Sequence, residues 1–279
     1  MTKFSNTELK TISYDLKKLV LTMLNQAGSG HTGAALGLSD IFAVLYGNVL
    51  NVSSAKPHLK SRDYLFLSNG HTCPILYATL AYFNFFDKKE LLTLRQINSR
   101  LQGHPHLGAL PGVENSGGPL GQGISQAVGL AAALKRDNKK NWVFCIVGDG
   151  ECEEGQVWEA LLFANKEQLD NLIIIVDKND VQIDGSPKEV IGFDQLVSKF
   201  QSFGCVTTEF NGNNISQIKT VIEHAKQTKG KPHVLIANTT LGSGVSFIEN
   251  RVEWHGKVPN DEELEVALHE VNYLQEQLK

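Results

Sequence analysis

An aspartate stands between two glycines at the point where an apolar segment ends. Residues 142–147 read Trp-Val-Phe-Cys-Ile-Val, and Gly148-Asp149-Gly150 follows directly. An apolar run that breaks at glycine and continues with helical spacing is typical of a buried strand that turns into a helix. Open α/β sheets bind phosphates at such turns. An aspartate that faces a bare phosphate would repel it, so Asp149 requires a cation between the two, for which Mg²⁺ is well suited.

A second polar side chain follows the next apolar segment. Residues 172–176 are apolar at every position, which is typical of a central strand covered on both faces, and Asn179 follows them. Asp149 and Asn179 are 30 positions apart, the length of one strand–helix–strand unit. On neighbouring strands their oxygens, with a backbone carbonyl from the turn after Asn179, would form half of an octahedral shell for Mg²⁺. Backbone N–H groups after Gly150, at a helix start, would bind the same phosphate.

Each of these features alone has a plainer explanation. Gly-Asp-Gly after a strand is often only a turn, and an asparagine at a strand end is often only a cap. The spacing of the pair favours a metal and phosphate site, because both side chains would otherwise fall at the ligand-binding edge by chance. A dinucleotide site is disfavoured, since Gly121-Gln-Gly123 follows a long loop, and Glu153 takes the last glycine position of the fingerprint around Asp149. No Walker A motif is present.

Alternating strands and helices would position these residues. Apolar segments predict strands at residues 64–67, 142–147, 172–176, 206–210 and 234–237. Helical spacing predicts helices over residues 9–23, 38–50, 76–83, 124–134, 157–162 and 215–227, and from about 261 to the end. The pattern predicts an α/β fold with a doubly wound, mostly parallel sheet and helices on both faces. No repeat or linker is visible, so we expect residues 1–279 to form a single domain.

The bulk composition excludes several classes of protein. The chain has 279 residues, of which 42% are hydrophobic, and its net charge of -4 provides no basic face for nucleic acid. The N-terminus has no secretory signal pattern, and no apolar run approaches the length of a membrane span. The four cysteines form no CxxC pair, so neither a zinc site nor a disulfide framework is indicated. We expect a cytoplasmic protein that binds neither nucleic acid nor membrane.

Several motifs, taken in order, resemble those of transketolase. Gly148-Asp149-Gly150 with the later Asn179 is similar to the thiamine diphosphate motif. Further segments that resemble transketolase in identity and order are Ala27–Gly33, Leu67–His71, Gly103–His106, Gly117–Ile124, Glu154–Ala160 and Trp254–Pro259. The resemblance covers nearly the whole chain but only the N-terminal third to half of a transketolase. It therefore implies the thiamine-diphosphate-binding fold of the domain that holds the diphosphate of the cofactor.

The resemblance also implies roles for individual residues. Asp149, Asn179 and the backbone carbonyl of Val181 would hold Mg²⁺, for which Ca²⁺ or Mn²⁺ can substitute. Contacts to thiamine diphosphate would come from His71, Gly118, Pro119, Leu120, Gly150, Glu154, Asn179 and His255. His31, His104 and His255 would be catalytic, binding sugar hydroxyls and moving protons, for which histidine is suited because its pKa lies near neutrality.

The chain ends before the second domain that transketolases have, which carries the glutamate that activates the cofactor. We therefore expect the N-terminal subunit of a split transketolase. It would transfer a two-carbon ketol unit from a ketose phosphate to an aldose phosphate, as in the pentose phosphate pathway. A separate C-terminal subunit with the pyrimidine-binding domain would complete an α2β2 heterotetramer. Alternatives are the α subunit of a 2-oxoacid dehydrogenase or related thiamine enzyme, and a non-catalytic regulatory homologue that binds the cofactor.

Overall fold

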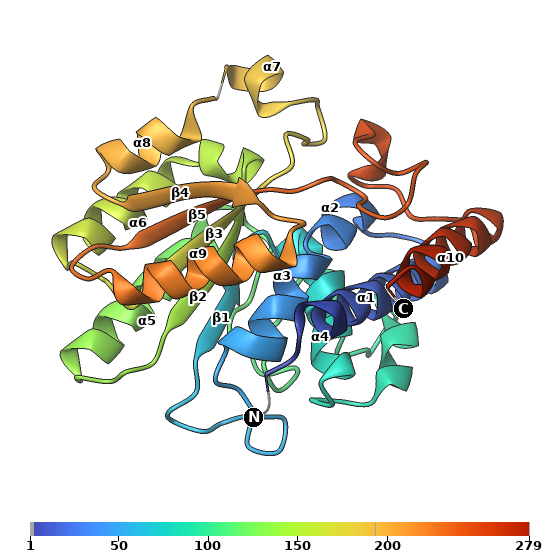
Figure 1. The fold of residues 1–279 in the computed structure, drawn as a ribbon, viewed down its shortest axis with the longest axis horizontal. Coiled ribbons are helices and arrows are strands. Elements are labelled where there is room, and N and C mark those ends of the chain that lie inside the picture. The colour runs from blue at the N-terminus through green and yellow to red at the C-terminus, as the bar shows by residue number, and fades with distance from the viewer. Residues whose placement is uncertain (1–2, 193, 279) are drawn as a thin grey trace.

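The structure is a computed structural model and describes residues 3–192 and 194–278. Within this part of the chain, five parallel strands form one sheet in the order β1-β2-β3-β5-β4 (Figure 1). The strands are β1 (Tyr64–Leu67), β2 (Val143–Gly148), β3 (Leu172–Lys178), β4 (Val206–Asn211) and β5 (His233–Asn238). The predicted parallel α/β sheet is confirmed. Its carboxyl ends at β1, β2 and β3 are neighbours, as the predicted metal site requires.

One face of the sheet is covered by the helices that follow the site motifs. Cys145, Val147 and Ile174 point into this core, in which no side chain of the central strands is exposed. The helices that pack there are α5 (Gln122–Arg136), α6 (Gly155–Lys166) and α8 (Leu196–Ser202). Because α5 and α6 begin directly after loops at the sheet edge, the packing of these helices in the core fixes where those loops end.

The opposite face carries a larger core. Phe144, Ile146 and Ile175, which alternate with the residues of the first core, point into it. This core includes α1 (Asn6–Ala27), α3 (Ser39–Val44), α4 (Cys73–Tyr82) and α9 (Ile215–Gln227). The C-terminal helix α10 (Asp261–Glu276) begins where the sequence predicts it and lies along α1 (Figure 1). Burial on both faces explains why the central strands are apolar at consecutive positions.

The end of α1 shows how the sequence places a site residue. Ser5 and Glu8 form a reciprocal capping box at its start, and Gly28 ends it in the left-handed conformation with φ 64°. Gly30 follows with φ 145°, and a Cβ there would come within 2.4 Å of the Leu24 side chain. Only glycine fits such a turn. The turn delivers His31 to the start of the short helix α2 (Thr32–Gly37).

Three details differ from the predictions. The helix predicted over residues 38–50 is interrupted, since α3 ends at Val44 and a π-helical turn covers Leu45–Val49. No α-helix starts directly after Gly150, because a 3₁₀ turn (Gly150–Glu153) precedes α6. Helix α8 and the short helix α7 (Pro187–Ile191) are absent from the sequence-based prediction. The second difference matters for the site, because the amides after Gly150 belong to a tight turn and not to an α-helix N-terminus.

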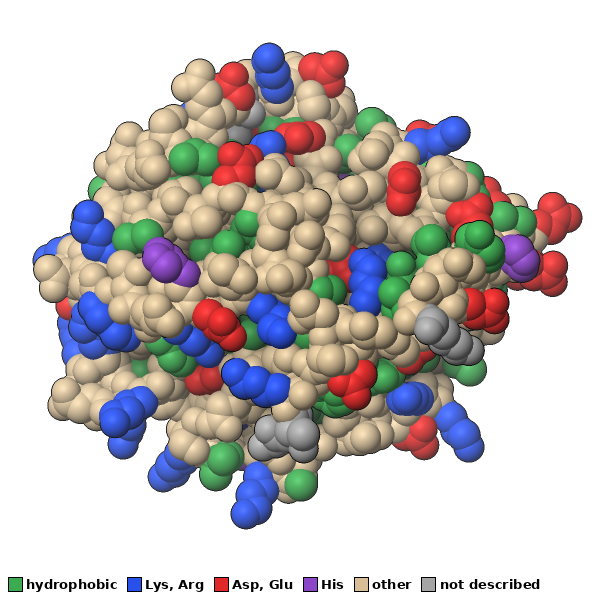
Figure 2. Space-filling view, in the orientation of Figure 1, with side chains coloured by type: hydrophobic (Ala, Val, Ile, Leu, Met, Phe, Trp, Pro, Cys, Tyr) green, Lys and Arg blue, Asp and Glu red, His purple; other side chains and the backbone are tan. Residues whose placement is uncertain are grey.

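The visible surface carries charges of both signs. Figure 2 shows acidic side chains gathered at the right, over α10, and basic side chains along the left and lower margins. Basic and acidic groups therefore share this face, in keeping with the net charge of -4. Within residues 3–192 and 194–278, every helix is too short or too polar to cross a membrane.

Candidate functional site

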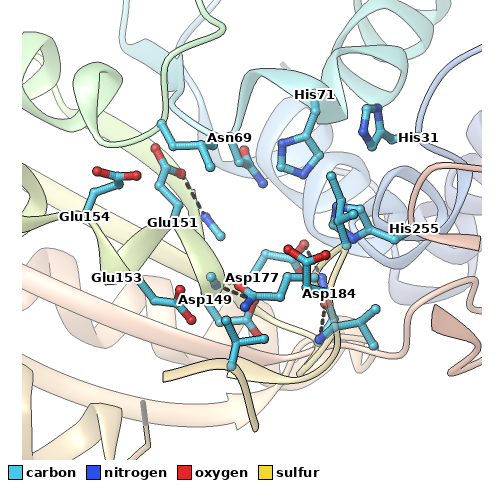
Figure 3. Close-up of a pocket in the computed structure, with 18 of the residues that line it drawn as sticks. His31, Asn69, His71, Asp149, Glu151, Glu153, Glu154, Asp177, Asp184 and His255 are labelled. Atoms are coloured by element: carbon cyan, nitrogen blue, oxygen red, sulfur yellow. Dashed lines mark hydrogen bonds between the residues drawn. The ribbon is translucent and has the colours of Figure 1, made fainter. Parts of the chain in front are cut away.

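The carboxyl ends of β1, β2 and β3 surround a cavity of about 430 Å³ (Figure 3). It brings together nearly all of the predicted site residues. Those that line it are His31, His71, His104, Gly118, Leu120, Asp149, Gly150, Glu154, Asn179, Val181 and His255. Pro119 is exposed and does not line the cavity. Residues from seven separate segments thus converge on one site.

Asp149 joins the ends of the two central strands. Its Oδ1 accepts a hydrogen bond from the Gly150 N–H at 2.8 Å, and its Oδ2 accepts one from the Asp180 N–H at 2.6 Å. Its own N–H donates to the carbonyl of Asp177 at 3.1 Å. The carboxylate is therefore fixed against the turn that contains Asn179 and Val181. Asp149 and Asn179 lie at the ends of neighbouring strands, as their spacing predicts.

Asp177 is a buried carboxylate that the sequence pattern does not single out. It accepts hydrogen bonds from the Thr239 hydroxyl at 2.5 Å and from Asn179 Nδ2 at 3.0 Å. Because Asn179 donates through Nδ2, its Oδ1 faces the other way, where it accepts from the Val181 N–H at 3.0 Å. Asp177 thus orients the predicted metal ligand. Asp177 stands at the end of the apolar strand β3, where an aspartate resembles an ordinary capping residue, so the sequence alone does not distinguish it.

Glu151 is the second residue of the site that the sequence pattern does not reveal. Its Oε1 accepts hydrogen bonds from the Ser68 hydroxyl at 2.5 Å and the Gly121 N–H at 2.7 Å, and its Oε2 accepts one from the Gly148 N–H at 3.0 Å. One buried carboxylate therefore ties together the end of β1, the Gly117–Gly121 loop and the end of β2. Its place directly after Gly148-Asp149-Gly150 is the available signal.

These three acids form what we call the carboxylate edge: Asp149, Glu151 and Asp177. Burial raises the pKa of each, and the Asp177 charge further raises that of Asp149, which reaches about 7. The pKa of Asp177 is about 6, because hydrogen bonds from Thr239 and Asn179 offset part of the burial effect. A raised pKa means that the negative charges are poorly compensated in the free chain. A cation at this edge would relieve that repulsion.

Four histidines form the opposite side of the cavity, which we call the histidine wall: His31, His71, His104 and His255. The ring centroids of His31, His71 and His255 lie 5.0–5.5 Å apart. Burial lowers the pKa of all four, to about 4 for His31 and about 3 for His71, where the neighbouring imidazoles lower it further. The rings are therefore neutral near pH 7. Nδ1 of both His31 and His255 is buried without a partner among the described residues.

Glycines allow the backbone to form the remaining walls. A Cβ at Gly150 would lie 2.5 Å from Oε1 of Gln182, in the turn that follows Val181. A Cβ at Gly70 would lie 2.9 Å from the Gly118 nitrogen, so the turn after β1 touches the Gly117–Gly121 loop through backbone alone. Gly118 has φ 138°, a conformation that side-chain-bearing residues rarely adopt. Backbone amides can therefore approach a ligand from two sides.

The donor set fits a diphosphate that is accompanied by a divalent cation. Six acidic side chains line the cavity, and the described lining contains no lysine or arginine. A diphosphate alone would be repelled, whereas hard oxygen ligands suit Mg²⁺. No group of three His, Cys, Asp or Glu side chains in the described ranges is arranged for a metal. A cation would therefore rely on Asp149 together with the Asn179 amide and backbone oxygens.

One glycine-rich segment that follows a strand does not join the site. Gly242–Gly244, after β5, packs on Ile248 and Lys17 and does not line the cavity. Lys17 is fully buried and donates to the carbonyls of Leu36 at 2.7 Å and Ser243 at 2.8 Å. Lys17 therefore connects α1 with α2 and with the loop after β5. Its role in the described structure is packing.

Comparisons with known proteins identify the family of the chain. The family profile "Transketolase, thiamine diphosphate binding domain" matches residues 9–276. An apulose-4-phosphate transketolase subunit of Actinobacillus succinogenes is 43% identical over 255 residues, with 91% of this chain and 92% of that protein covered. The 6-deoxy-6-sulfo-D-fructose transketolase subunit SqwG of a Clostridium species is 36% identical over 256 residues, with 92% and 93% covered.

Solved structures show the same fold in larger proteins. Transketolase from Leishmania mexicana superposes with a TM-score of 0.83 at 29% identity, covering 99% of this chain and 46% of that one. Transketolase from Campylobacter jejuni superposes with a TM-score of 0.84 at 29% identity, covering 97% and 48%. The chain thus spans about half the length of these transketolases but nearly the full length of the subunits above. Together, the profile and the relatives show that this chain belongs to the transketolase family and that its N-terminal, thiamine diphosphate-binding domain covers the chain.

Proposed function

We propose that the chain is the N-terminal subunit of a two-chain transketolase that depends on thiamine diphosphate and Mg²⁺. The observation that carries the proposal is the meeting of the carboxylate edge and the histidine wall in one cavity. The edge offers ligands for a cation and its diphosphate, and the wall offers neutral proton acceptors beside them. A binding protein for the cofactor alone would need the first of these but not the second.

The carboxylate edge would hold the cofactor's diphosphate through the cation. Asp149, Asn179 and the Val181 carbonyl would be metal ligands, and the backbones of Gly150 and Gly118 to Leu120 would contact the phosphates. When bound, thiamine diphosphate supplies the nucleophilic carbon and the electron sink that ketol transfer requires. The protein would supply binding, orientation and electrostatics. His255 hydrogen-bonds the Val181 backbone, which links the metal turn to the histidine wall.

The histidine wall would bind and orient the donor sugar. Neutral imidazoles can accept a proton from a sugar hydroxyl and return it, as general acid–base catalysis requires. His31 and His255 each have a buried Nδ1 with no partner in the described chain, so a ligand hydroxyl could complete them. The donor would be an anionic ketose. The relatives' names include both a sugar phosphate and a sulfo sugar.

A second chain would complete the site at the edge of α6. Glu154 lines the cavity with an exposed carboxylate, and no hydrogen bond or ion pair to it is found in the described residues. Helix α6 also exposes the large apolar side chains Leu162 and Phe163. We infer that this surface meets a C-terminal subunit, whose pyrimidine-binding domain would pair a carboxylate with Glu154. Two copies of each chain would give an α2β2 assembly.

Reconstitution tests the proposal. The chain alone, with Mg²⁺ and thiamine diphosphate, should show no ketol transfer, whereas mixing it with a C-terminal transketolase subunit from the same genome should produce transfer. The donor panel would contain xylulose 5-phosphate, apulose 4-phosphate and 6-deoxy-6-sulfofructose. Ample turnover by the chain alone would contradict the two-chain arrangement.

Glu154→Gln separates the interface role from a structural one. In the reconstituted complex it should lower kcat by about 10²-fold or more, the range for losing an acid–base group, while the melting temperature of the free chain stays unchanged. Glu159→Gln, exposed on the same helix, is the matched control. Full activity of Glu154→Gln in the complex would remove Glu154 from the site.

A further inference from the structure

Asn69 is a buried side chain that the protein itself leaves without hydrogen bonds. It is the second residue after β1, and only 1% of its surface is exposed. Both Nδ2 and Oδ1 of its amide are buried with no partner among the described residues. The side chain lines the cavity, and Figure 3 shows it between Glu151 and His71 with its amide directed toward the centre.

The surrounding polar groups are already satisfied. The Thr72 hydroxyl and N–H both donate to the Asn69 carbonyl at 2.9 Å, and the Asn69 N–H donates to Ile146 at 3.4 Å. The Ser68 hydroxyl is taken by Glu151. The turn therefore gains nothing from the amide itself. Burying an amide without partners destabilises a protein, so the fold alone would be served better by an apolar side chain of the same size.

The position of Asn69 indicates which ligand atoms it would meet. The next residue, Gly70, lies against Gly118 so closely that a Cβ would come within 2.9 Å of the Gly118 nitrogen. On the other side, the Cβ of Asn69 lies 3.8 Å from the place a Gly148 Cβ would take. Asn69 thus stands between the Gly118 loop and the Gly148-Asp149 turn, the two segments to which the proposed function assigns the diphosphate.

The charge of the cavity explains why an uncharged donor is useful there. Six carboxylates line it, and no lysine or arginine appears in the described lining. Diphosphate oxygens only accept hydrogen bonds, so a neutral N–H₂ group stabilises them without competing with the cation for the carboxylates. A diphosphate has no hydrogen-bond donor for Oδ1 of Asn69. Because Mg²⁺ usually keeps several waters, one of these waters could donate to Oδ1.

We propose that Asn69 is a cofactor-binding residue whose Nδ2 donates a hydrogen bond to the diphosphate of thiamine diphosphate. The inference rests on the proposed function, because it takes the diphosphate as the ligand of this cavity. It adds a residue outside the predicted ligand set. It also explains the unpaired amide: the described part of the free chain offers it no hydrogen bond, and the bound ligand would.

Two variants and one matched control test the inference. Asn69→Leu keeps the size and removes both polar atoms, and Asn69→Asp replaces the donor with a negative charge. Asn115 is the control, because it is equally buried beside β1 but fully bonded: its Oδ1 accepts from the Leu67 N–H at 3.0 Å and its Nδ2 donates to the Leu67 carbonyl at 3.1 Å. The melting temperature of the free chain of 279 residues is measured, and thiamine diphosphate and inorganic pyrophosphate are each titrated in the presence of Mg²⁺ by calorimetry.

Asn69→Leu should melt at or above the wild-type temperature, whereas Asn115→Leu should melt several degrees lower. Asn69→Leu should bind both thiamine diphosphate and pyrophosphate about tenfold to hundredfold more weakly, as expected for a lost bond to a charged group. Asn69→Asp should bind them more weakly still, because its carboxylate repels phosphate.

Three results would overturn the inference while leaving the proposed function intact. They are a clear drop in the melting temperature of Asn69→Leu, wild-type affinity of that variant for both ligands, and weaker binding of thiamine diphosphate with unchanged binding of pyrophosphate. The last would place the amide against another part of the cofactor. A wild-type chain that binds neither ligand would contradict the proposed function itself, and the inference would fall with it.

Discussion

The two sides of the cavity differ in how many of their buried polar atoms have a hydrogen-bond partner within the described chain. At the carboxylate edge, the buried oxygens of Asp149, Glu151 and Asp177 accept hydrogen bonds from backbone or side-chain donors. At the histidine wall, Nδ1 of His31 and Nδ1 of His255 are buried without partners in the described chain. The amide of the adjoining Asn69 is likewise buried without a partner among the described residues. The fold itself satisfies the acceptors of the edge, whereas it leaves polar atoms at and beside the wall that a ligand can bind.

The two sides also respond to pH in opposite directions. Burial raises the carboxyl pKa values, to about 7 at Asp149 and about 6 at Asp177, and lowers the imidazole pKa values, to about 4 at His31 and about 3 at His71. Both shifts disfavour the charged form. Acidification therefore opposes folding at the wall, whereas alkalinisation opposes it at the edge. A cation would stabilise only the edge.

The largest expected effect comes from removing the central carboxylate of the edge. Asp149→Ala deletes the proposed metal ligand and the acceptor of two backbone bonds, so Mg²⁺-dependent binding of thiamine diphosphate should be abolished. Calorimetric titration of the free chain measures this. Chelation of Mg²⁺ with EDTA should have the same effect on the wild-type chain.

A remote aspartate controls for the change of charge. Asp137→Ala, at the exposed end of α5, should bind the cofactor as the wild-type chain does. Retained cofactor affinity in Asp149→Ala would show that the edge does not hold the metal. The assignment of the cation to one side of the cavity would then be wrong.

A smaller effect should follow from Glu151→Gln. The amide oxygen can still accept from Ser68 and Gly121, but its N–H₂ group would face the Gly148 N–H, so two donors would meet. An unsatisfied buried donor costs about 1–3 kcal/mol, and the free energy of unfolding should fall by about that amount. Urea denaturation measures it. A variant as stable as wild type would mean that the edge is less preorganised than its hydrogen bonds indicate.

The smallest effect concerns the pH dependence of the histidine wall. His71 faces His31, His104 and His255, and its folded pKa of about 3 lies below the ordinary 6.5. Between those values the unfolded chain binds a proton that the folded chain does not, so stability is lost as pH falls through this window. In His71→Gln the drop in melting temperature between about pH 7 and about pH 5 should shrink. His224→Gln, exposed on α9, should leave it unchanged, and an identical drop in His71→Gln would argue against a buried neutral ring.

The sequence is informative wherever a motif coincides with a strand end. Burial on both faces makes β2 and β3 apolar almost throughout, so their ends, and with them Asp149 and Asn179, can be located from hydrophobicity alone. Parallel pairing of neighbouring strands then brings the two residues to one edge, as predicted. The placement of the histidines in the same cavity follows from resemblance, since nothing in their spacing requires His31 and His255 to meet.

What could not be predicted depends on contacts between distant segments. Glu151 looks like one acid among several in its segment, and only the folded chain shows that it receives bonds from Ser68 and Gly121. Asn69 looks like a turn residue, and its missing partners appear only once its surroundings are known. The interrupted helix after Val44 and the 3₁₀ turn after Gly150 are local geometry, which hydrophobic periodicity does not resolve.

The carboxylate of Glu151 also has a consequence for the order in which the site forms. It joins partners 83 and 30 residues away, so closing these contacts carries the entropy of two large loops. Local helices can form earlier, but the cavity floor requires β1, the Gly117–Gly121 loop and β2 to be in place together. We therefore expect the amide protons of Gly121 and Gly148 to exchange with solvent only in openings that disrupt the sheet, and not through loop fluctuations.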